Sequence, residues 1–315
     1  MRVLLVRLDG IGDAAVCTPL IAALRAAGHT VGVALSTRNA GLFDAAAIVT
    51  EHVLDRIPWP AHGSTPESTA RATAAIAAQH YDAALVASEE TEAYTLARPI
   101  PLRAGFTTGW TRPFKNLWVR QQLTRPVRRS QRTGAGAEHE VEALYRLGHG
   151  LVSAARAPDD LAQLRPILTS LPVPARRDAP VVVQAGAKWA ASGVNGEALR
   201  AIVRRLEPRG VRVVAAPHER EAAAAELGVA VESFGWLPDW IAALDGSAAV
   251  VTTDTGAAHV AGMLGVPVVD VFPERDFAVQ TRRWRPWASP FRLVRAGMLR
   301  GGSSGIIIEA ELNAL

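Results

Sequence analysis

Short apolar runs alternate along the chain with longer stretches in which apolar residues recur at helical spacing. Strands that are apolar on both faces and alternate with helices are typical of a parallel sheet covered on both sides. The pattern predicts strands at residues 2–8, 30–35, 48–54, 82–86, 180–184, 211–215, near 231, at 250–253 and from 266. It predicts helices at residues 14–27, 39–48, 67–79, 138–147, 196–206, 218–227, 238–244, 256–265 and 305–315. The fold class is therefore α/β.

The alternation of strands and helices forms two blocks of similar size. Before residue 180 it is interrupted by several prolines and by Arg176, Arg177 and Asp178, which favours a linker. A length of 315 residues suits two domains that each have a core. We expect an N-terminal domain at residues 1–165, a linker at 166–179, a second domain at 180–300 and a C-terminal helix at 301–315.

Between residues 98 and 132 the pattern loosens into proline, glycine, tryptophan and arginine. We interpret this stretch as long loops with little regular structure. Loops of this size in a compact domain are usually functional or mobile.

Composition narrows the class of protein. With 49% hydrophobic and 20% charged residues, the chain is globular. No stretch is long and apolar enough to span a bilayer, and the N-terminal apolar run is too short and too charged for a signal peptide. The single cysteine, Cys17, excludes an intramolecular disulfide and suits a reducing compartment, so we expect a cytoplasmic protein. A net charge of +4 is a mild bias toward acidic partners and is no nucleic-acid signature.

Two tight turns join a strand to a helix and carry the candidate chemistry. The first reads Asp9-Gly10-Ile11-Gly12-Asp13, and the second reads Asp254-Thr255-Gly256. Ligands of open α/β sheets bind beyond the carboxyl ends of strands, and the free N–H groups of a helix start favour anions. The second turn therefore predicts a site for a phosphate-bearing ligand.

Each turn also has a purely structural interpretation. Asp13, Asp254 and Thr255 are residue types that cap helices in any protein. His259 would then be an ordinary core histidine.

The first turn also fits a dinucleotide site. Gly10, Gly12 and Ala15 satisfy the pattern G-x-G-x-x-A between a strand and a helix. A dehydrogenase should have an acid at the end of the next strand, where this chain has none, although Arg38 suits a 2′-phosphate. An NAD(P)-binding oxidoreductase is therefore one alternative, and a module that binds nucleotide or glycan without turnover is another.

Both turns resemble motifs of one known family. The segment Arg7 to Asp13, followed by Thr18-Pro19-Leu20, is similar to the start of the heptosyltransferases of glycosyltransferase family 9. The stretch from Asp254 to Pro267 resembles that family's D-T-G-x-x-H-x-A-x-x-x-G-x-P signature. Further counterparts are Pro217-His218-Glu219, Gly235-Trp236-Leu237 and Tyr81-Asp82.

The resemblance implies a GT-B fold, in which two Rossmann-like domains with parallel sheets face each other across a cleft. In such proteins the last helix often packs back on the first domain. The family transfers a sugar from a nucleoside diphosphate with inversion and without a metal. The chain contains no Asp-x-Asp pair, and its histidines lack ligand spacing, which agrees with the last point.

The resemblance also assigns roles to residues. Asp13 matches the general base, which takes a proton from the acceptor hydroxyl. The residues that match donor-binding positions are Lys188, Glu219, Asp254, Thr255, Gly256 and His259. The turn before Lys188 is shorter than in the family, and Glu219 is also explained as an acid in a first helical turn.

The resemblance further implies the substrates. The donor is an ADP-sugar, ADP-heptose in the family, and no separate cofactor is expected. The acceptor is a glycan, a lipid-linked glycan or a small molecule, and a lipid-linked one would draw the protein to the inner face of the membrane. If the acceptor is acidic, Arg112, Arg125 and Arg128 are candidate ligands for its carboxylates or phosphates. The alternative for these arginines is a solvated basic surface.

Overall fold

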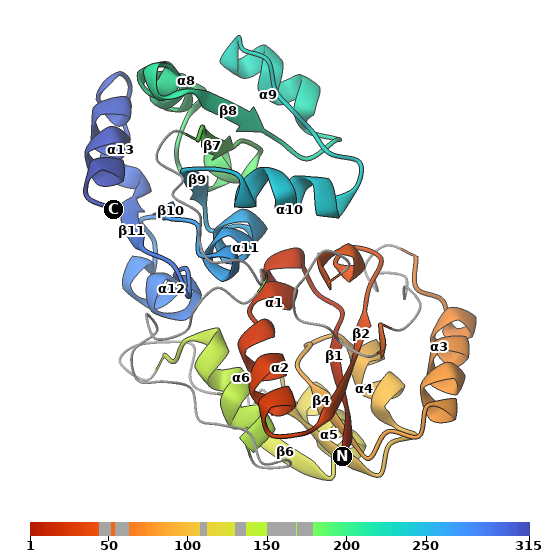
Figure 1. The fold of residues 1–315 in the computed structure, drawn as a ribbon. Helices are drawn as coiled ribbons and strands as arrows, with labels where there is room; N and C mark the ends of the chain where they lie inside the picture. The colour runs from red at the N-terminus through yellow and green to blue at the C-terminus, as the bar shows by residue number, and fades with distance from the viewer. Residues whose placement is uncertain (44–51, 54–62, 108–111, 130–136, 150–167, 169–178) are drawn as a thin grey trace. The chain divides into compact units, whose positions relative to one another are not determined.

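The chain folds into two compact units, Met1–Asp159 and Asp160–Leu315 (Figure 1). This is seen in a computed structural model that describes residues 1–43, 52–53, 63–107, 112–129, 137–149, 168 and 179–315. Each unit contains a parallel sheet with helices packed on it. The predicted α/β class is confirmed.

The first unit is built on a parallel sheet that, in its described residues, has six strands in the order β3-β2-β1-β4-β5-β6. Its strands are β1 (Arg2–Arg7), β2 (Thr30–Leu35), β3 (His52–Val53), β4 (Ala83–Val86), β5 (Leu102–Thr107) and β6 (Arg125–Arg128). Its helices are α1 (Ile11–Ala15), α2 (Thr18–Ala26), η1 (Ala40–Phe43), α3 (Pro66–Ala78), α4 (Thr91–Ala97), α5 (Pro113–Gln122) and α6 (Glu140–His149).

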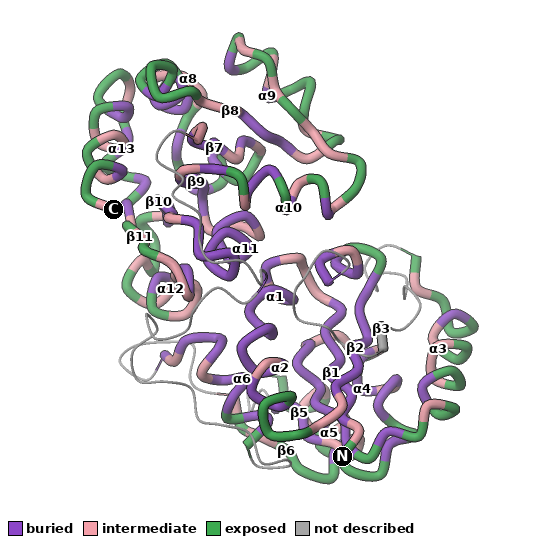
Figure 2. The backbone as a smooth tube through the Cα atoms, viewed as in Figure 1, coloured by how far each residue is buried: buried purple, intermediate pink, exposed green. Residues whose placement is uncertain are grey.

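Apolar residues on both faces of the central strands explain this sheet. All four residues of β4 are buried, and Figure 2 shows buried backbone running through the middle of the unit. One face packs against α3, α4 and α5 in a core that includes Leu4, Val6 and Tyr94. On the other face α6 lies close to α2, because a methyl group on Gly148 would come within 2.8 Å of the Leu20 side chain. The sheet is therefore covered on both sides.

The second unit is built on a parallel sheet that, in its described residues, has five strands in the order β11-β10-β9-β7-β8. Its strands are β7 (Val181–Gln184), β8 (Val211–Val214), β9 (Ala249–Thr253), β10 (Val268–Phe272) and β11 (Phe291–Arg295). Its helices are α7 (Lys188–Ala191), α8 (Gly196–Leu206), η6 (Glu207–Arg209), α9 (Arg220–Leu227), α10 (Leu237–Asp245), α11 (Gly256–Leu264), α12 (Phe277–Trp284), η7 (Ala296–Met298) and α13 (Ser303–Asn313).

The C-terminal helix α13 packs on α8 of the same unit (Figure 1). Ile308 and Leu312 belong to the same buried cluster as Ile202 of α8 and Val251 of β9. Glycine at position 305 lets the two helices touch, since a methyl group there would lie 2.5 Å from the Ala201 carbonyl oxygen. Ile308 and Leu312 are thus used in the core of the second unit, and the return of this helix to the first domain stays a prediction.

The region 98–132 is more regular than its sequence indicates, and the prediction of long loops there is wrong. It contains β5, α5 and β6. Pro113 starts α5 at the helix position that tolerates proline, and only Val119 of that helix is buried. Because α5 and β6 lie at an exposed edge, their polar residues hide the apolar spacing that usually reveals an element.

Other predicted elements differ in extent. The helix expected at residues 39–48 begins as the short 3₁₀ segment η1, and residues 44–48 lie outside the described chain. The strand expected near residue 231 is reduced to one bridge between Val214 and Glu232. The structure adds α4, α12 and β11, which the sequence did not predict. Of the predicted linker 166–179, residues 166–167 and 169–178 lie outside the described part.

The strand order of both sheets reverses next to one strand. In the first unit β2 lies on one side of β1 and β4 on the other, and in the second unit β8 and β9 flank β7 in the same way. In open α/β sheets, ligands bind at the carboxyl ends of the strands where the order reverses. The turns that follow β1, β4, β7 and β9 are therefore the places to look for a site.

Candidate functional site

Asp13 lies in the short helix α1, just beyond the carboxyl end of β1. Its Oδ2 accepts a hydrogen bond from the Gly10 N–H at 3.0 Å, and its Oδ1 lies 2.5 Å from Arg7 Nη2. Gly10 is the N-cap residue, so Asp13 supports the helix start without being the cap itself. Its side chain remains 30% exposed. Asp13 is therefore a partly exposed carboxylate that is held by two donors, while Gly12 is buried beside it.

The side chain of Arg7 lies at the centre of the charged contacts around this turn. Arg7 is the last residue of β1, and its side chain is only 4% exposed. Its Nε lies 3.0 Å from an Asp9 oxygen, and its Nη1 lies 3.3 Å from Glu140 and donates to the Ala87 carbonyl at 2.5 Å. Burial lowers the pKa of Arg7, but the carboxylates of Asp13 and Asp9 more than offset this, so that its pKa is raised. Arg7 is therefore a permanently charged group that gathers acids from three segments.

Glu140 continues the network from the start of α6. Its side chain is 2% exposed, and its second oxygen lies 2.5 Å from Arg129 Nη2. Arg129 lies over the ring of Phe106 at 5.0 Å and 3.7 Å from a Glu89 oxygen. The sequence prediction missed Arg7, Glu140 and Arg129. A charged residue inside an apolar strand, as at Arg7, was the available signal, because a buried charge is rarely without a partner.

Asp9 and Asn39 shape the rest of the turn. Burial raises the pKa of Asp9, which Arg7 lowers and Asp13 raises. The Asn39 side chain donates to the carbonyls of Arg7 and Asp9, at 3.1 and 3.0 Å, and accepts from the Ser36 N–H at 2.9 Å. The end of β2, where a dehydrogenase places its ribose-binding acid, is instead formed by Leu35 and Ser36.

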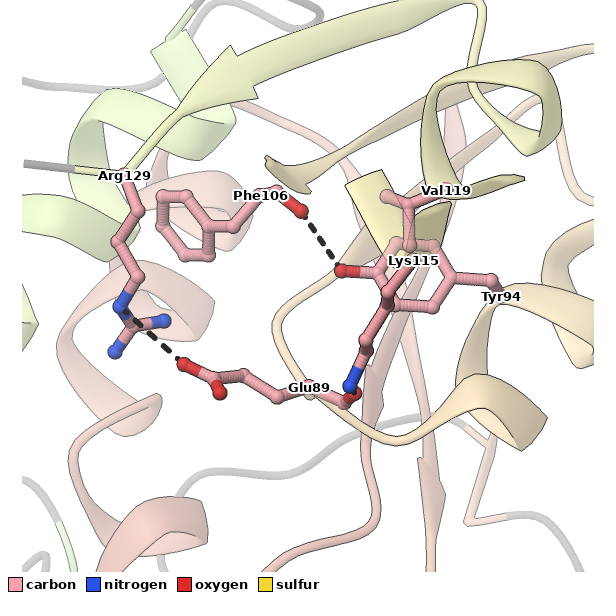
Figure 3. A pocket seen from close by; sticks show the side chains of 6 residues that line it. All are labelled: Glu89, Tyr94, Phe106, Lys115, Val119 and Arg129. Carbon is pink, nitrogen blue, oxygen red and sulfur yellow. Dashed lines mark hydrogen bonds and ion pairs between the residues drawn. The ribbon is translucent and has the colours of Figure 1, made fainter. Parts of the chain in front are cut away.

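A small pocket lies beside this network (Figure 3). Its lining residues are Glu89, Tyr94, Phe106, Lys115, Val119 and Arg129. Tyr94 donates to the Phe106 carbonyl at 2.8 Å, and Lys115 donates to the Glu89 carbonyl at 2.7 Å. The pocket is about the size of one water molecule, which is too small for a sugar ring. The side chains that line it pack around Arg129.

The three arginines proposed as acceptor ligands lie close by but are exposed. Arg112 is the N-cap residue of α5, and Arg125 and Arg128 are the ends of β6. The next residue, Arg129, is the one whose side chain turns into the structure, at 8% exposure. Trp110, two residues before Arg112, lies outside the described residues.

In the second unit, the turn after β9 has the geometry of an anion-binding helix start. Thr255 is the N-cap residue of the nine-residue helix α11. Its Oγ1 accepts a hydrogen bond from the Ala257 N–H at 3.3 Å and lies 2.9 Å from Thr252 Oγ1. Gly256 opens the helix without a side chain to block the backbone. The structural interpretation of Thr255 as a cap is therefore right, and the remaining N–H groups at this helix start are those suited to an anion.

Asp254 and His259 lie near each other across this turn. His259 Nε2 is 3.8 Å from Asp254 Oδ1, and the histidine is only 5% exposed. Its ring packs edge-on against Trp284, with 5.6 Å between the ring centroids. His259 is thus a packed core residue that also faces the acid of the turn.

Glu219 contacts the turn after β7, just before Lys188. The Glu219 carboxylate accepts a hydrogen bond from the Ala187 N–H at 2.9 Å. Gly186 has a φ of 148° and lies so close that a methyl group there would come within 2.6 Å of Glu219 Oε2. Lys188 is exposed and begins α7. Glu219 therefore fixes the turn that presents Lys188, a structural role that the sequence did not predict.

Asp270 is a buried acid in the strand beside β9. It is fully buried, and neither carboxylate oxygen has a hydrogen-bond partner among the described residues. Burial raises the pKa of Asp270 well above its usual range, Asp254 raises it further, and Lys188 lowers it. Asp270 is therefore a buried acid whose ionised form is disfavoured, and it lies in the strand next to β9. The sequence prediction missed it, although an acid in the middle of the run Val268–Phe272 was a visible signal.

Two features are absent from the described residues: a metal site and a membrane-spanning helix. The described side chains contain no group of three or more His, Cys, Asp or Glu that could hold a metal ion. Within the same residues, every helix is too short or too polar to cross a bilayer.

Comparisons with known proteins place the fold. The sequence profile of glycosyltransferase family 9 (heptosyltransferase) matches residues 69–298. A search of curated proteins found no match.

Several solved structures share the fold over nearly the whole chain. The glycosyl transferase family 9 protein from Veillonella parvula has a TM-score of 0.72 at 14% identity, covering 99% of this chain and 96% of its own. The E. coli heptosyltransferase WaaC, solved with ADP, has a TM-score of 0.70 at 21% identity, covering 99% of this chain and 100% of its own. The E. coli ADP-heptose lps heptosyltransferase II has a TM-score of 0.72 at 18% identity, covering 100% of this chain and 98% of its own.

Proposed function

The chain belongs to glycosyltransferase family 9, the heptosyltransferase family, and is a glycosyltransferase with the GT-B fold; from this premise we propose that it transfers a heptose from ADP-heptose to an acceptor hydroxyl, with inversion. The observation that carries the proposal is the environment of Asp13. It is a partly exposed carboxylate at the point where the first sheet reverses, held by the Gly10 N–H and by Arg7.

In the proposed reaction Asp13 is the general base. Its carboxylate takes the proton of the acceptor hydroxyl as that oxygen attacks the anomeric carbon of the donor. The bond between the anomeric carbon and the phosphate oxygen breaks on the opposite face, and its electron pair leaves with the diphosphate. General base catalysis of this kind contributes typically about 10²–10⁴-fold to a rate.

The donor turn of the second unit supplies the other half of the proposal. The start of α11, with Thr255 as its N-cap, offers backbone N–H groups to the charge that develops on the leaving diphosphate. Lys188 is the cation presented by the neighbouring turn. Asp254 and His259 complete the expected donor contacts. Protein groups then meet the diphosphate charge in the way that a metal ion does in other transferases.

The substrates are the finer part of the proposal. ADP is bound by the similar protein WaaC, which favours an adenine nucleotide for this chain as well. The acceptor is a glycan or a small molecule, and a lipid-linked acceptor would place the protein at a membrane surface. Cofractionation with membranes checks that location.

The two alternatives are weaker. Leu35 and Ser36 at the end of β2 leave a dinucleotide without its usual ribose acid. A module without turnover would bind ADP-heptose but release no ADP when acceptor is added, so an assay of ADP release separates it from an enzyme.

The first prediction concerns Asp13→Asn. The amide keeps the size of the side chain but cannot accept a proton, so turnover should fall by at least about 10²-fold while the affinity for ADP is unchanged. The measurements are ADP release with donor and acceptor, and calorimetric titration with ADP.

Asp82→Asn is the matched control, because Asp82 is an exposed acid of the same unit. It precedes β4 and therefore lies at the amino-terminal ends of the strands, whereas Asp13 lies beyond their carboxyl ends. The Asp82→Asn variant should transfer like the wild type. Near-normal turnover in Asp13→Asn would end the assignment of the base. The anomeric configuration of the product, read by NMR, must be opposite to that of the donor.

A further inference from the structure

Five charged side chains in the first unit form one continuous chain of alternating sign that ends on the base. Its members, in order, are Asp13, Arg7, Glu140, Arg129 and Glu89. We propose that Glu140 and Arg129 are positioning residues that act through Arg7 to fix the orientation of Asp13 and the pH at which it takes a proton. This inference rests on the proposed role of Asp13 as the base.

The orientation of Asp13 follows from the way Arg7 is held. A guanidinium is planar and rigid, so fixing its other nitrogens fixes the one that faces Asp13. Nη1 donates to the Ala87 carbonyl at 2.5 Å and to Glu140 at 3.3 Å, while Nε lies 3.0 Å from Asp9 as an ion pair without hydrogen-bond geometry. Nη2 is then aimed at Asp13 at 2.5 Å.

Glu140 links the two arginines of this series of charges. Its two oxygens serve two different arginines, Arg7 and Arg129, and its side chain is almost fully buried. Screening by solvent is weak for such a pair, so a change of charge here is felt at Asp13. No direct contact between Glu140 and the acceptor is needed for this effect.

Arg129 anchors the far end. Figure 3 shows its guanidinium between the ring of Phe106 and the carboxylate of Glu89. Arg129, Phe106 and Glu89 line one small pocket together with Tyr94, Lys115 and Val119, so this end of the series lies among packed side chains.

The signs of the charges give opposite effects. The negative charge of Glu140 disfavours the ionised form of Asp13, whereas the positive charge of Arg129 favours it. Neither residue contacts Asp13 directly. We therefore expect each to move the acid-side fall of kcat by roughly 0.5–1 pH unit, less than a direct partner does.

Other titratable groups face this site and must be considered. They are Asp9 from the turn, Cys17 from the start of α2, and Glu89 and Glu90 from the segment after β4. Burial raises the pKa of Cys17 to about 12, so it stays neutral in the range of interest. Burial also raises the pKa of Asp9, so the acid side of the rate profile belongs to Asp9 and Asp13 together. Both acids face Arg7, so the sign of the expected shift is the same for each.

The test compares the pH dependence of kcat for the wild type with Glu140→Gln and Arg129→Gln in the full-length protein. A base is lost as pH falls through its pKa, so kcat falls on the acid side. That fall should move to lower pH in Glu140→Gln and to higher pH in Arg129→Gln, and in the double variant it should return close to the wild-type position. Each single variant leaves the remaining charges a partner. In Glu140→Gln, Arg7 still pairs with Asp9 and Asp13, and in Arg129→Gln, Glu140 still pairs with Arg7.

Glu138→Gln is the matched control. Glu138 pairs with Arg146 at the exposed surface just before and within α6, and this pair does not contact Arg7. Its profile should match that of the wild type. Shifts in the same direction for both test variants, or no shift, would overturn the inference, since a purely structural loss has no reason to change sign. If only one test variant folds, the sign of its shift decides.

Failure of the inference can be told from failure of the proposed function. If Asp13→Asn is active, the base is wrong whatever the profiles show. If Asp13→Asn is inactive and the profiles do not move, only the role of Glu140 and Arg129 is wrong.

Discussion

At the scale of single residues, the most unusual group outside the network is Asp270. A carboxylic acid is buried in an apolar strand with no hydrogen-bond partner for either oxygen among the described residues. Burial of this kind disfavours the ionised form and raises the pKa of Asp270 well above its usual range. Its cost to stability therefore depends on pH.

The prediction for Asp270 concerns how the free energy of unfolding changes with pH. The unfolded chain releases this proton above about pH 3.9, whereas the folded chain, whose pKa is raised, retains it. The folded state then binds more protons, so the free energy of unfolding falls as pH rises, by at most about 1.4 kcal/mol per pH unit, until the folded pKa is passed. Asp270→Asn removes this term.

Urea unfolding of both proteins between about pH 5 and pH 8 is the measurement. The stability of Asp270→Asn relative to the wild type should increase with pH. Two curves that stay parallel would mean that Asp270 is ionised or accessible in the folded protein.

At the scale of elements, the strands that could be predicted are those buried on both faces. β1, β4, β7 and β9 are apolar runs that end in turn residues, and the sequence places each of them within a few residues. α5 and β6 escaped because one side of each faces solvent. Pattern alone works where burial is complete and fails at edges.

The candidate site divides in the same way. Asp13 and Thr255 belong to turns whose local sequence states their chemistry, so both were found. The contact between Arg7 and Glu140 joins residues that are 133 positions apart. The contact exists because α6 packs beside α2, the helix that follows β1 along the chain, on one face of the sheet. No local pattern in the sequence reveals this arrangement.

The contact between α13 and α8 gives an element-scale prediction. In Gly305→Ala the new methyl group would lie 2.5 Å from the Ala201 carbonyl oxygen and 2.7 Å from Arg205 Cβ. Overpacking of this kind costs about 1–3 kcal/mol, which exceeds the helix preference of about 1 kcal/mol that alanine has over glycine. The variant should unfold at lower denaturant concentration than the wild type.

Gly302→Ala is the control, because nothing lies within 4 Å of a methyl group at the start of the same helix. Its stability should stay within about 0.5 kcal/mol of the wild type. Equal stability of Gly305→Ala and Gly302→Ala would show that α13 can move away from α8 at no cost.

At the scale of the whole molecule, the two units can be observed separately. Five of the eight tryptophans lie in the second unit, namely Trp189, Trp236, Trp240, Trp284 and Trp287. The single cysteine, Cys17, is buried in the first unit, and its raised pKa makes the folded thiol unreactive. Tryptophan fluorescence is therefore weighted toward the second unit, whereas alkylation of Cys17 reports on the first alone.

This separation yields a test of where the donor binds. If the second unit holds the nucleotide, ADP at a hundredfold over its Kd stabilises that unit by about 2.7 kcal/mol. The midpoint read by tryptophan should rise more than the midpoint read by Cys17 alkylation, with adenosine as the control ligand without phosphates. A larger shift in the cysteine signal would place the nucleotide in the first unit.

The position of α13 also bears on how the chain is made. A ribosome delivers the first unit, with every residue of its core, before the second unit has begun. The second core contains Ile308 and Leu312, so β7 must wait for more than a hundred further residues before its hydrophobic surroundings are complete. During that interval its apolar strands are open to chaperones and to neighbouring chains. A ribosome that stalls before residue 303 would release a chain whose first unit is folded and whose second unit is a substrate for proteolysis.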